Sequence, residues 1–172
     1  QARLAKAGLR INAICPGWTH SEMVDPALEA LPEQLGALID QIHKLIGGDE
    51  NECAKLMTRK ARALGMSKTI YRNASGLPND EQITTARDQA TLGRAIQDRF
   101  PKYYRYFATS TFVYKGNSIR NHNRLLGSVE GVDGIKTGHT STAGFCLLAS
   151  AQRDNQRLIS IVMGIDSKSQ AE

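Results

Sequence analysis

Residues 131–140 read GVDGIKTGHT, and two apolar runs follow them, GFCLLASA at residues 144–151 and LISIVMGI at residues 158–165. Four polar residues, Arg153-Asp154-Asn155-Gln156, separate the two runs. Apolar runs joined by a polar turn are typical of a β-hairpin, and the second run is rich in β-branched residues. Both runs are apolar on both faces, so we expect a sheet that is covered on each side. The glycines of residues 131–140 mark places where another backbone comes close. We therefore predict three adjacent antiparallel strands, one of them carrying Lys136.

Upstream of these strands, apolar residues recur at helical spacing in three segments. The first covers residues 33–46 and the second residues 50–64, where Asp49 is a good N-cap. The third begins after Thr85 and ends at Pro101. Its buried side is predicted to consist of Ala86, Ala90, Gly93, Ile96 and Phe100. Helices first and a compact sheet last predict an α+β fold in which the helices cover the sheet.

The composition suits an ordinary globular domain, because 41% of the 172 residues are hydrophobic and 23% are charged. This length fits one domain, or one domain with an appendage. The net charge is +5, and the basic residues are scattered. The densest group lies around the second helical segment without interleaved aromatic residues. This favours a solvated helix face over a nucleic-acid site.

The sequence predicts no metal site and no cofactor. Cys15, Cys53 and Cys146 are far apart and form no C-x-x-C pair, which argues against zinc. No signal peptide and no apolar run long enough to span a bilayer are present in this sequence. Because the chain begins without Met, we expect further residues before Gln1.

The triplet Lys136-Thr137-Gly138 has the chemistry of a carboxylate-binding strand. Lys136 supplies a cation for a peptide that ends in a free carboxylate, and the Thr137 hydroxyl can hydrogen-bond the same group. Gly138 has no Cβ, so a substrate backbone can approach the strand edge. The backbone N–H of His139 could serve an oxyanion hole. Taken alone, the triplet favours the simpler interpretation of an exposed lysine and a turn glycine on an edge strand.

The surroundings of the triplet resemble the serine D-alanyl-D-alanine carboxypeptidases, the low-molecular-weight penicillin-binding proteins of peptidase family S11. The matching blocks keep the order and spacing of that family over roughly residues 42 to 167. They are Arg59-Lys60-Ala61, Leu64-Gly65-Met66, Asn73-Ala74-Ser75-Gly76-Leu77-Pro78, Thr85-Ala86-Arg87-Asp88, Phe100-Pro101, Asn121-His122-Asn123-Arg124-Leu125-Leu126, Val132-Asp133-Gly134-Ile135-Lys136-Thr137-Gly138-His139-Thr140, Ala143-Gly144-Phe145 and Leu148-Ala149-Ser150-Ala151.

The resemblance implies a β-lactamase/transpeptidase-like antiparallel sheet covered by helices, incomplete in this chain. It implies a serine that attacks the terminal D-Ala-D-Ala bond of peptidoglycan stem peptides, and that β-lactams trap. It also implies that Lys136 and Thr137 bind the substrate carboxylate and that His139 gives its backbone N–H to the oxyanion hole. The implied location is periplasmic or extracytoplasmic.

Two motifs of this family are absent from the sequence. No lysine has a serine three residues before it, and no asparagine has a serine two residues before it. A serine hydrolase needs a nucleophile and a base that activates it, and neither can be named here. Ser75 and Ser150 have no lysine at the right offset, and we interpret them as turn and strand residues. We therefore predict no catalytic residue and no activity of this chain alone.

The first 24 residues resemble another family, the short-chain dehydrogenases/reductases, through Leu4-Ala5 and Gly8-Leu9-Arg10-Ile11-Asn12-Ala13-Ile14-Cys15-Pro16-Gly17-Trp18. No G-x-x-x-G-x-G phosphate loop accompanies them, so no nicotinamide site can be assembled. We predict that residues 1–32 are a dehydrogenase-like segment rather than a domain, and that residues 33–172 are part of a carboxypeptidase domain. Residues 1–25 are expected to pack poorly against the rest.

Three functions remain open from the sequence: a carboxypeptidase-family protein, an inert or peptide-binding remnant, and a dehydrogenase fragment. The ring of His139 is a general-base candidate by residue type, although the resemblance favours its backbone. His122 lies between two asparagines that we expect to shape a loop near the site. Asp133 is interpreted as a brace for a turn before the strand, because no second carboxylate accompanies it.

Overall fold

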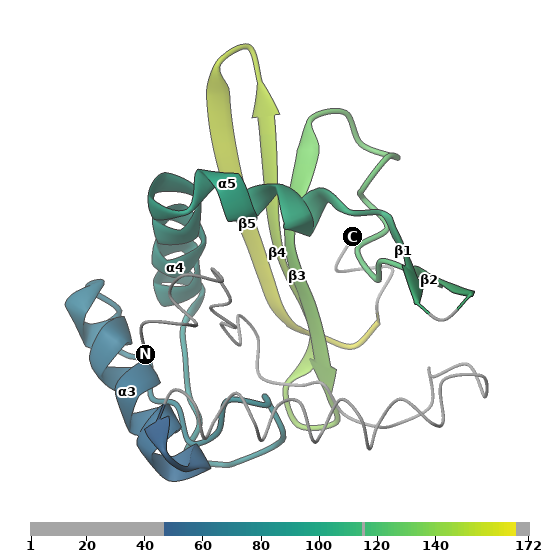
Figure 1. Cartoon of the computed structure of the whole chain (residues 1–172). Helices are drawn as coiled ribbons and strands as arrows, with labels where there is room; N and C mark the ends of the chain where they lie inside the picture. Colours follow the sequence, from purple (N-terminus) through teal and green to yellow (C-terminus); the bar gives the residue numbers. More distant parts are fainter. Residues whose placement is uncertain (1–46, 115, 168–172) are drawn as a thin grey trace.

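The computed structural model describes residues 47–114 and 116–167, and Figure 1 shows their arrangement. The helices are α3 (Glu50–Ala63), α4 (Ala86–Arg99), α5 (Pro101–Tyr104) and the 3-10 helix η2 (Arg105–Ala108). The strands are β1 (Thr111–Tyr114), β2 (Asn117–Arg120), β3 (Val132–Thr140), β4 (Gly144–Arg153) and β5 (Gln156–Ile165). The predicted helix at residues 33–46 and the segment 1–32 lie outside the described residues.

The three C-terminal strands form one antiparallel sheet in the order β3-β4-β5, as predicted. Asp154 and Asn155 join β4 to β5, and both have positive φ angles, 46° and 61°. Asp and Asn tolerate this conformation and are typical of two-residue hairpin turns. The strands extend one residue further into the predicted turn on each side, because Arg153 pairs with Gln156.

The two strands of this hairpin differ in burial, which corrects one prediction. The centre of β4 is buried from Cys146 to Ser150, as expected for a covered strand. In the part of the chain that the structure describes, β5 contains exposed and half-buried residues and no buried one. The helix α4 packs on one face of β5, and Leu158 remains exposed. The half-buried residues Ile159 and Ile161 pack against the main core, and Val162 and Ile165 pack against a second cluster, so β5 is covered only in part.

The helices α3 and α4 begin where their caps predict. The Asp49 carboxylate accepts a hydrogen bond from the backbone N–H of Glu52 at 2.9 Å, and the Thr85 hydroxyl accepts one from the N–H of Asp88 at 3.2 Å. Such bonds satisfy N–H groups that have no partner inside the helix. The side chain of Glu52 forms an ion pair with Lys55 at 2.6 Å.

The main core lies between α3, α4 and the sheet. Its buried members are Ala61, Met66, Tyr71, Leu92, Ile96, Tyr104, Ile135 and Leu148. Gly93 lets α4 approach the sheet closely, because a Cβ there would lie 3.1 Å from the Cδ1 atom of Ile135. The side chain of Ile135 from β3 therefore reaches the surface of α4, while the helix itself packs on β4 and β5.

The predicted buried side of α4 was partly wrong. Ala86 is exposed, and Asp88 and Gln89 are buried instead. The Asp88 carboxylate accepts hydrogen bonds from the N–H of Lys68 and the hydroxyl of Thr69, at 2.8 and 2.7 Å. Burial of a carboxylate is tolerated when such bonds replace water. Polar residues thus occupy part of a face that the apolar pattern assigned to alanines.

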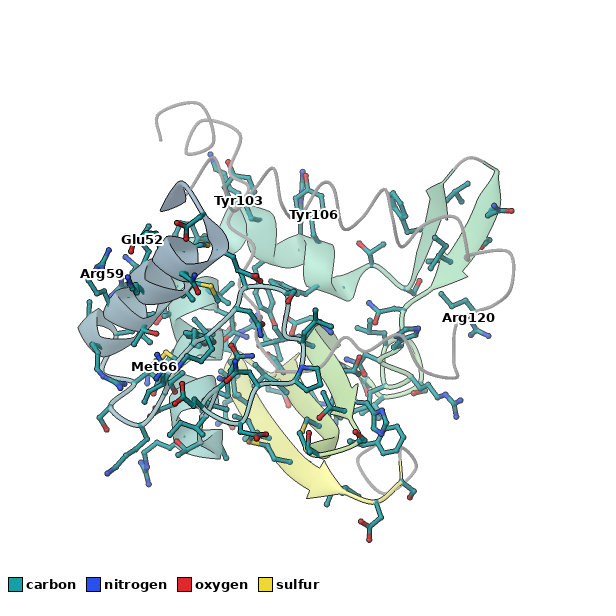
Figure 2. All side chains as sticks on the ribbon, turned by 90° about the horizontal axis from the view of Figure 1, so that it is seen from below. Glu52, Arg59, Met66, Tyr103, Tyr106 and Arg120 are labelled. Carbon is teal, nitrogen blue, oxygen red and sulfur yellow. The ribbon has the colours of Figure 1, made fainter. Side chains whose placement is uncertain are left out.

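Two short elements after α4 were not predicted. Pro101 ends α4 but is also the first residue of α5, a position that proline favours. Tyr103 on α5 and Tyr106 on η2 project away from the three strands (Figure 2). The hairpin of β1 and β2 follows, with Phe112 paired to Ile119.

Candidate functional site

The four residues predicted to bind substrate lie together on β3. Lys136, Thr137, Gly138 and His139 pair across to residues 148, 147, 146 and 145 of β4, in that order. Leu148, opposite Lys136, packs in the main core with the helices, and Leu147, opposite Thr137, packs in a second cluster on the other face of the sheet. The prediction that Lys136 lies on a strand of an antiparallel sheet is confirmed.

All four residues are half-buried, so each keeps some contact with solvent. The Lys136 ammonium donates a hydrogen bond to the carbonyl of Thr137. The ring of His139 stacks on that of Phe145, with centroids 4.1 Å apart and planes tilted by 32°. This cross-strand pair orients the imidazole beside the triplet. Both roles considered for His139, through its ring or its backbone, remain predictions.

A polar cluster lies just before the triplet, on the helix-covered side of the sheet. Asp133 accepts hydrogen bonds from the Tyr104 hydroxyl at 3.0 Å and from Arg157 at 2.7 Å. Arg157 also donates to the Ser150 hydroxyl at 3.0 Å, and Gln97 donates to the same hydroxyl at 2.7 Å. Asp133 therefore braces the strand itself rather than a turn before it. Sequence reasoning missed Arg157, Tyr104 and Gln97 as its partners.

The loop before β3 is shaped by its two asparagines, as predicted. Asn121 donates a side-chain hydrogen bond to the carbonyl of Thr109 and accepts one from the N–H of Asn123, both at 2.9 Å. Asn123 is buried and donates to the carbonyl of Gly134 at 3.2 Å. His122 between them is exposed. The loop is thereby attached to β3 two residues before Lys136.

Neither candidate serine has the surroundings of a nucleophile. Ser150 is 1% exposed and lies in β4, where its hydroxyl accepts from Gln97 and Arg157. Ser75 lies in a loop and donates to the side chain of Asn73 at 3.3 Å. A nucleophilic hydroxyl needs a neighbouring base and access to substrate. The interpretation of Ser150 as a strand residue is confirmed.

Among the described residues, no cluster of three or more His, Cys, Asp or Glu side chains could hold a metal ion. The same residues contain no helix long and apolar enough to cross a membrane.

Burial raises the pKa of the Tyr104 hydroxyl above its ordinary value of 10.0, while hydrogen bonds from Ser150 and Gln97 act in the opposite direction. A folded protein that holds this proton more tightly loses stability as the pH rises past 10, because the unfolded chain then releases the proton first. Below pH 10 the Tyr104 hydroxyl is protonated in both the folded and the unfolded chain, so its contribution to stability is fully present. The free energy of unfolding should decrease less between pH 9 and pH 11 in Tyr104→Phe than in the original protein. Urea denaturation at several pH values measures this. Equal slopes for the two proteins would contradict this assignment.

A family model described as D-alanyl-D-alanine carboxypeptidase, peptidase S11, matches residues 40–167. The D-alanyl-D-alanine carboxypeptidase DacD of Escherichia coli K12 is 38% identical over 123 residues, which are 71% of this chain and 32% of that protein. The chain spans about a third of the length of the curated relatives it matches. The family match begins at residue 40, so it lends no support to the dehydrogenase resemblance of the first residues.

Solved structures agree with this match. Penicillin binding protein 5 from Haemophilus influenzae is similar with a TM-score of 0.72 and 33% identity, over 77% of this chain and 39% of that one. Penicillin-binding protein D2 from Listeria monocytogenes, solved in its ampicillin-bound form, has a TM-score of 0.70 and 31% identity, over 77% of this chain and 55% of that one. The predicted α+β, transpeptidase-like fold is confirmed.

Proposed function

This chain belongs to the D-alanyl-D-alanine carboxypeptidase family, and from that premise we propose that it supplies the carboxylate-binding strand of an enzyme that trims peptidoglycan stem peptides. The substrate is a peptide ending in D-Ala-D-Ala, and the product is the peptide shortened by one D-alanine. Such stem peptides lie outside the cytoplasmic membrane, so the proposed place of action is the cell envelope. β-Lactams are the proposed inhibitors of the whole enzyme.

The observation that carries this proposal is the position of Lys136-Thr137-Gly138 on β3. Lys136 is half-buried, so its ammonium can neutralise a peptide carboxylate with less competition from water than an exposed lysine would meet. The Thr137 hydroxyl would bind the same carboxylate, and the backbone N–H of His139 would stabilise the developing oxyanion. Because Gly138 has no Cβ, a peptide backbone would be able to approach the strand there.

The chemical step itself requires residues that this sequence does not contain. No Ser-x-x-Lys is present to provide the acylated serine and its base, and no Ser-x-Asn is present. This absence favours a second function for the isolated chain, which is to bind peptides with a free D-alanine carboxylate without cleaving them. A dehydrogenase function has no support in the described residues.

A hybrid protein tests the proposal. It joins the part of the E. coli carboxypeptidase that precedes its matched segment to residues 42–167 of this chain. We expect the hybrid to release D-alanine from an acyl-D-Ala-D-Ala peptide. We expect Lys136→Ala to reduce kcat/KM about ten- to a hundred-fold, because one charge-assisted contact with the carboxylate is lost.

The matched control is Lys102→Ala, which removes an exposed lysine of α5 and should leave kcat/KM unchanged. Two results would count against the proposal. A folded hybrid that releases no D-alanine would contradict the carboxypeptidase function, and full activity of Lys136→Ala would contradict the role of the lysine.

A further inference from the structure

Asp133 stands at an irregularity in the pairing of β3 with β4. Val132 pairs with Ala151 and Gly134 pairs with Ser150, so the register shifts between residues 132 and 134. Asp133 is the extra residue and has no Cα partner on β4. Such a bulge interrupts the backbone ladder and leaves the strand free to bend locally. Other contacts must therefore fix the start of β3.

The side chain of Asp133 provides one of these contacts. Its two carboxylate oxygens are bound separately, one by the Tyr104 hydroxyl and the other by the Arg157 guanidinium. The side chains of Arg157 and Asp133 are 32% and 28% exposed, so their ion pair is partly shielded from solvent and stronger than an exposed pair. Arg157 lies on β5, and its guanidinium also donates a hydrogen bond to the Ser150 hydroxyl of β4. Asp133 thus connects β3 to the far strand and to α5.

Gly134 is held from another direction. Its carbonyl accepts the Asn123 amide at 3.2 Å, and the Asn123 side chain also accepts the N–H of Leu125 at 3.1 Å. Asn123 is 3% exposed, so both bonds are sheltered from competing water. A Cβ on residue 134 would lie 3.0 Å from both the Phe107 Cβ and the Tyr104 hydroxyl. A side chain at residue 134 would therefore require Phe107 or Tyr104 to move by a few tenths of an ångström, so β3 packs tightly against α5 and η2 here.

We propose that Asp133 and Asn123 are positioning residues that hold the substrate-binding segment Lys136–Gly138 in place. The two sets of contacts hold the adjacent residues Asp133 and Gly134, which are three and two positions before Lys136. Within the described residues, β3 is the end strand of its sheet, with a backbone ladder on one side only. The position of an end strand depends strongly on what anchors its ends. What the segment binds rests on the proposed function, whereas its anchoring does not.

Amide hydrogen exchange of the full 172-residue chain, followed by NMR, tests the inference without any ligand. We expect Asp133→Ala and Asn123→Ala each to accelerate exchange of the protected amides among residues 135–139 about tenfold or more. Amides of α3 should change little in either variant. Asp133→Asn keeps an acceptor for Tyr104 but loses the charge that Arg157 binds, so its effect should be intermediate.

The matched control is Asp98→Ala, which removes an exposed carboxylate of α4 that lies 3.6 Å from Arg94. It should leave the exchange of residues 135–139 unchanged. The positioning role is overturned if Asp133→Ala and Asn123→Ala accelerate α3 and β3 equally, or if neither changes β3. If Asp133→Ala does not fold, Asp133→Asn and Asn123→Ala decide the question.

The hybrid protein separates this inference from the proposed function. Local acceleration of exchange in β3, together with a folded hybrid that releases no D-alanine, would support the positioning role and contradict the enzyme assignment. An active hybrid whose β3 exchange is unaffected by both substitutions would support the enzyme assignment and overturn the positioning role.

Discussion

Labelled penicillin is expected to leave the intact 172-residue chain unmodified. Acylation needs a serine with a base beside it, because an unassisted hydroxyl is a weak nucleophile at neutral pH. No serine stands three residues before a lysine in this sequence. Lys136 cannot act as that base while it serves as the carboxylate cation, since the cation must stay protonated. Mass spectrometry of the intact protein after penicillin treatment makes the measurement.

The hybrid protein is the positive control for the penicillin experiment. It contains the serine and lysine that the family resemblance implies, so it should gain the mass of one penicillin. A stoichiometric adduct on any serine of the unmodified 172-residue chain would show that a nucleophile exists here after all. Ser150 is the least expected place for it, because its hydroxyl is almost inaccessible and already bound by two donors.

The parts of the fold that sequence predicted correctly carry local signals. Asp49 and Thr85 cap the two long helices through bonds to residues three positions later. The hairpin of β4 and β5 has a polar turn at Asp154 and Asn155 between apolar runs. Caps and turns act within a few residues, so a single sequence contains the information that places them.

The parts that sequence missed depend on distant residues or on very short elements. The helix α5 has four residues, and Pro101 was interpreted only as the end of α4. The strands β1 and β2 also have four residues each. Asp88 can be buried on α4 because Lys68 and Thr69 donate hydrogen bonds to its carboxylate. These partners lie about twenty residues earlier in the sequence. Apolar periodicity cannot show such polar partners.

The candidate site divides in the same way. Lys136 was placed on its strand because the neighbouring residues form a pattern that extends along β3. The anchors of that strand come from elsewhere: Tyr104 is 29 residues and Arg157 is 24 residues from Asp133. Nothing in the local pattern around Arg157 indicates a partner on β3, since the strand β4 lies between them in the sheet. The fold and the family were therefore predictable from the sequence. The contacts that anchor β3 at Asp133 were not, because they join residues that are far apart in the chain.

Replacement of Leu148 is expected to have the largest effect on stability. Leu148→Ala should lower the free energy of unfolding by about 2–5 kcal/mol, because it removes buried methyl groups and leaves a cavity. Leu148 is 0% exposed and belongs to the core between the sheet and α4. Its side chain lies beside Gly93 of that helix. A domain of this size has only about 5–15 kcal/mol of stability, so the loss is a large share. Urea denaturation measures it.

Leu158→Ala is the matched control, since it makes the same chemical change on β5 at a side chain that is 68% exposed. We expect a change of about 0.5 kcal/mol or less there. Equal losses at the two positions would show that β5 is covered where the structure has it exposed. Leu148 also pairs with Lys136 across β3 and β4, so its replacement should loosen the substrate-binding strand as well as the core. The stability of the core and the placement of the cation thus depend on the same pair of strands.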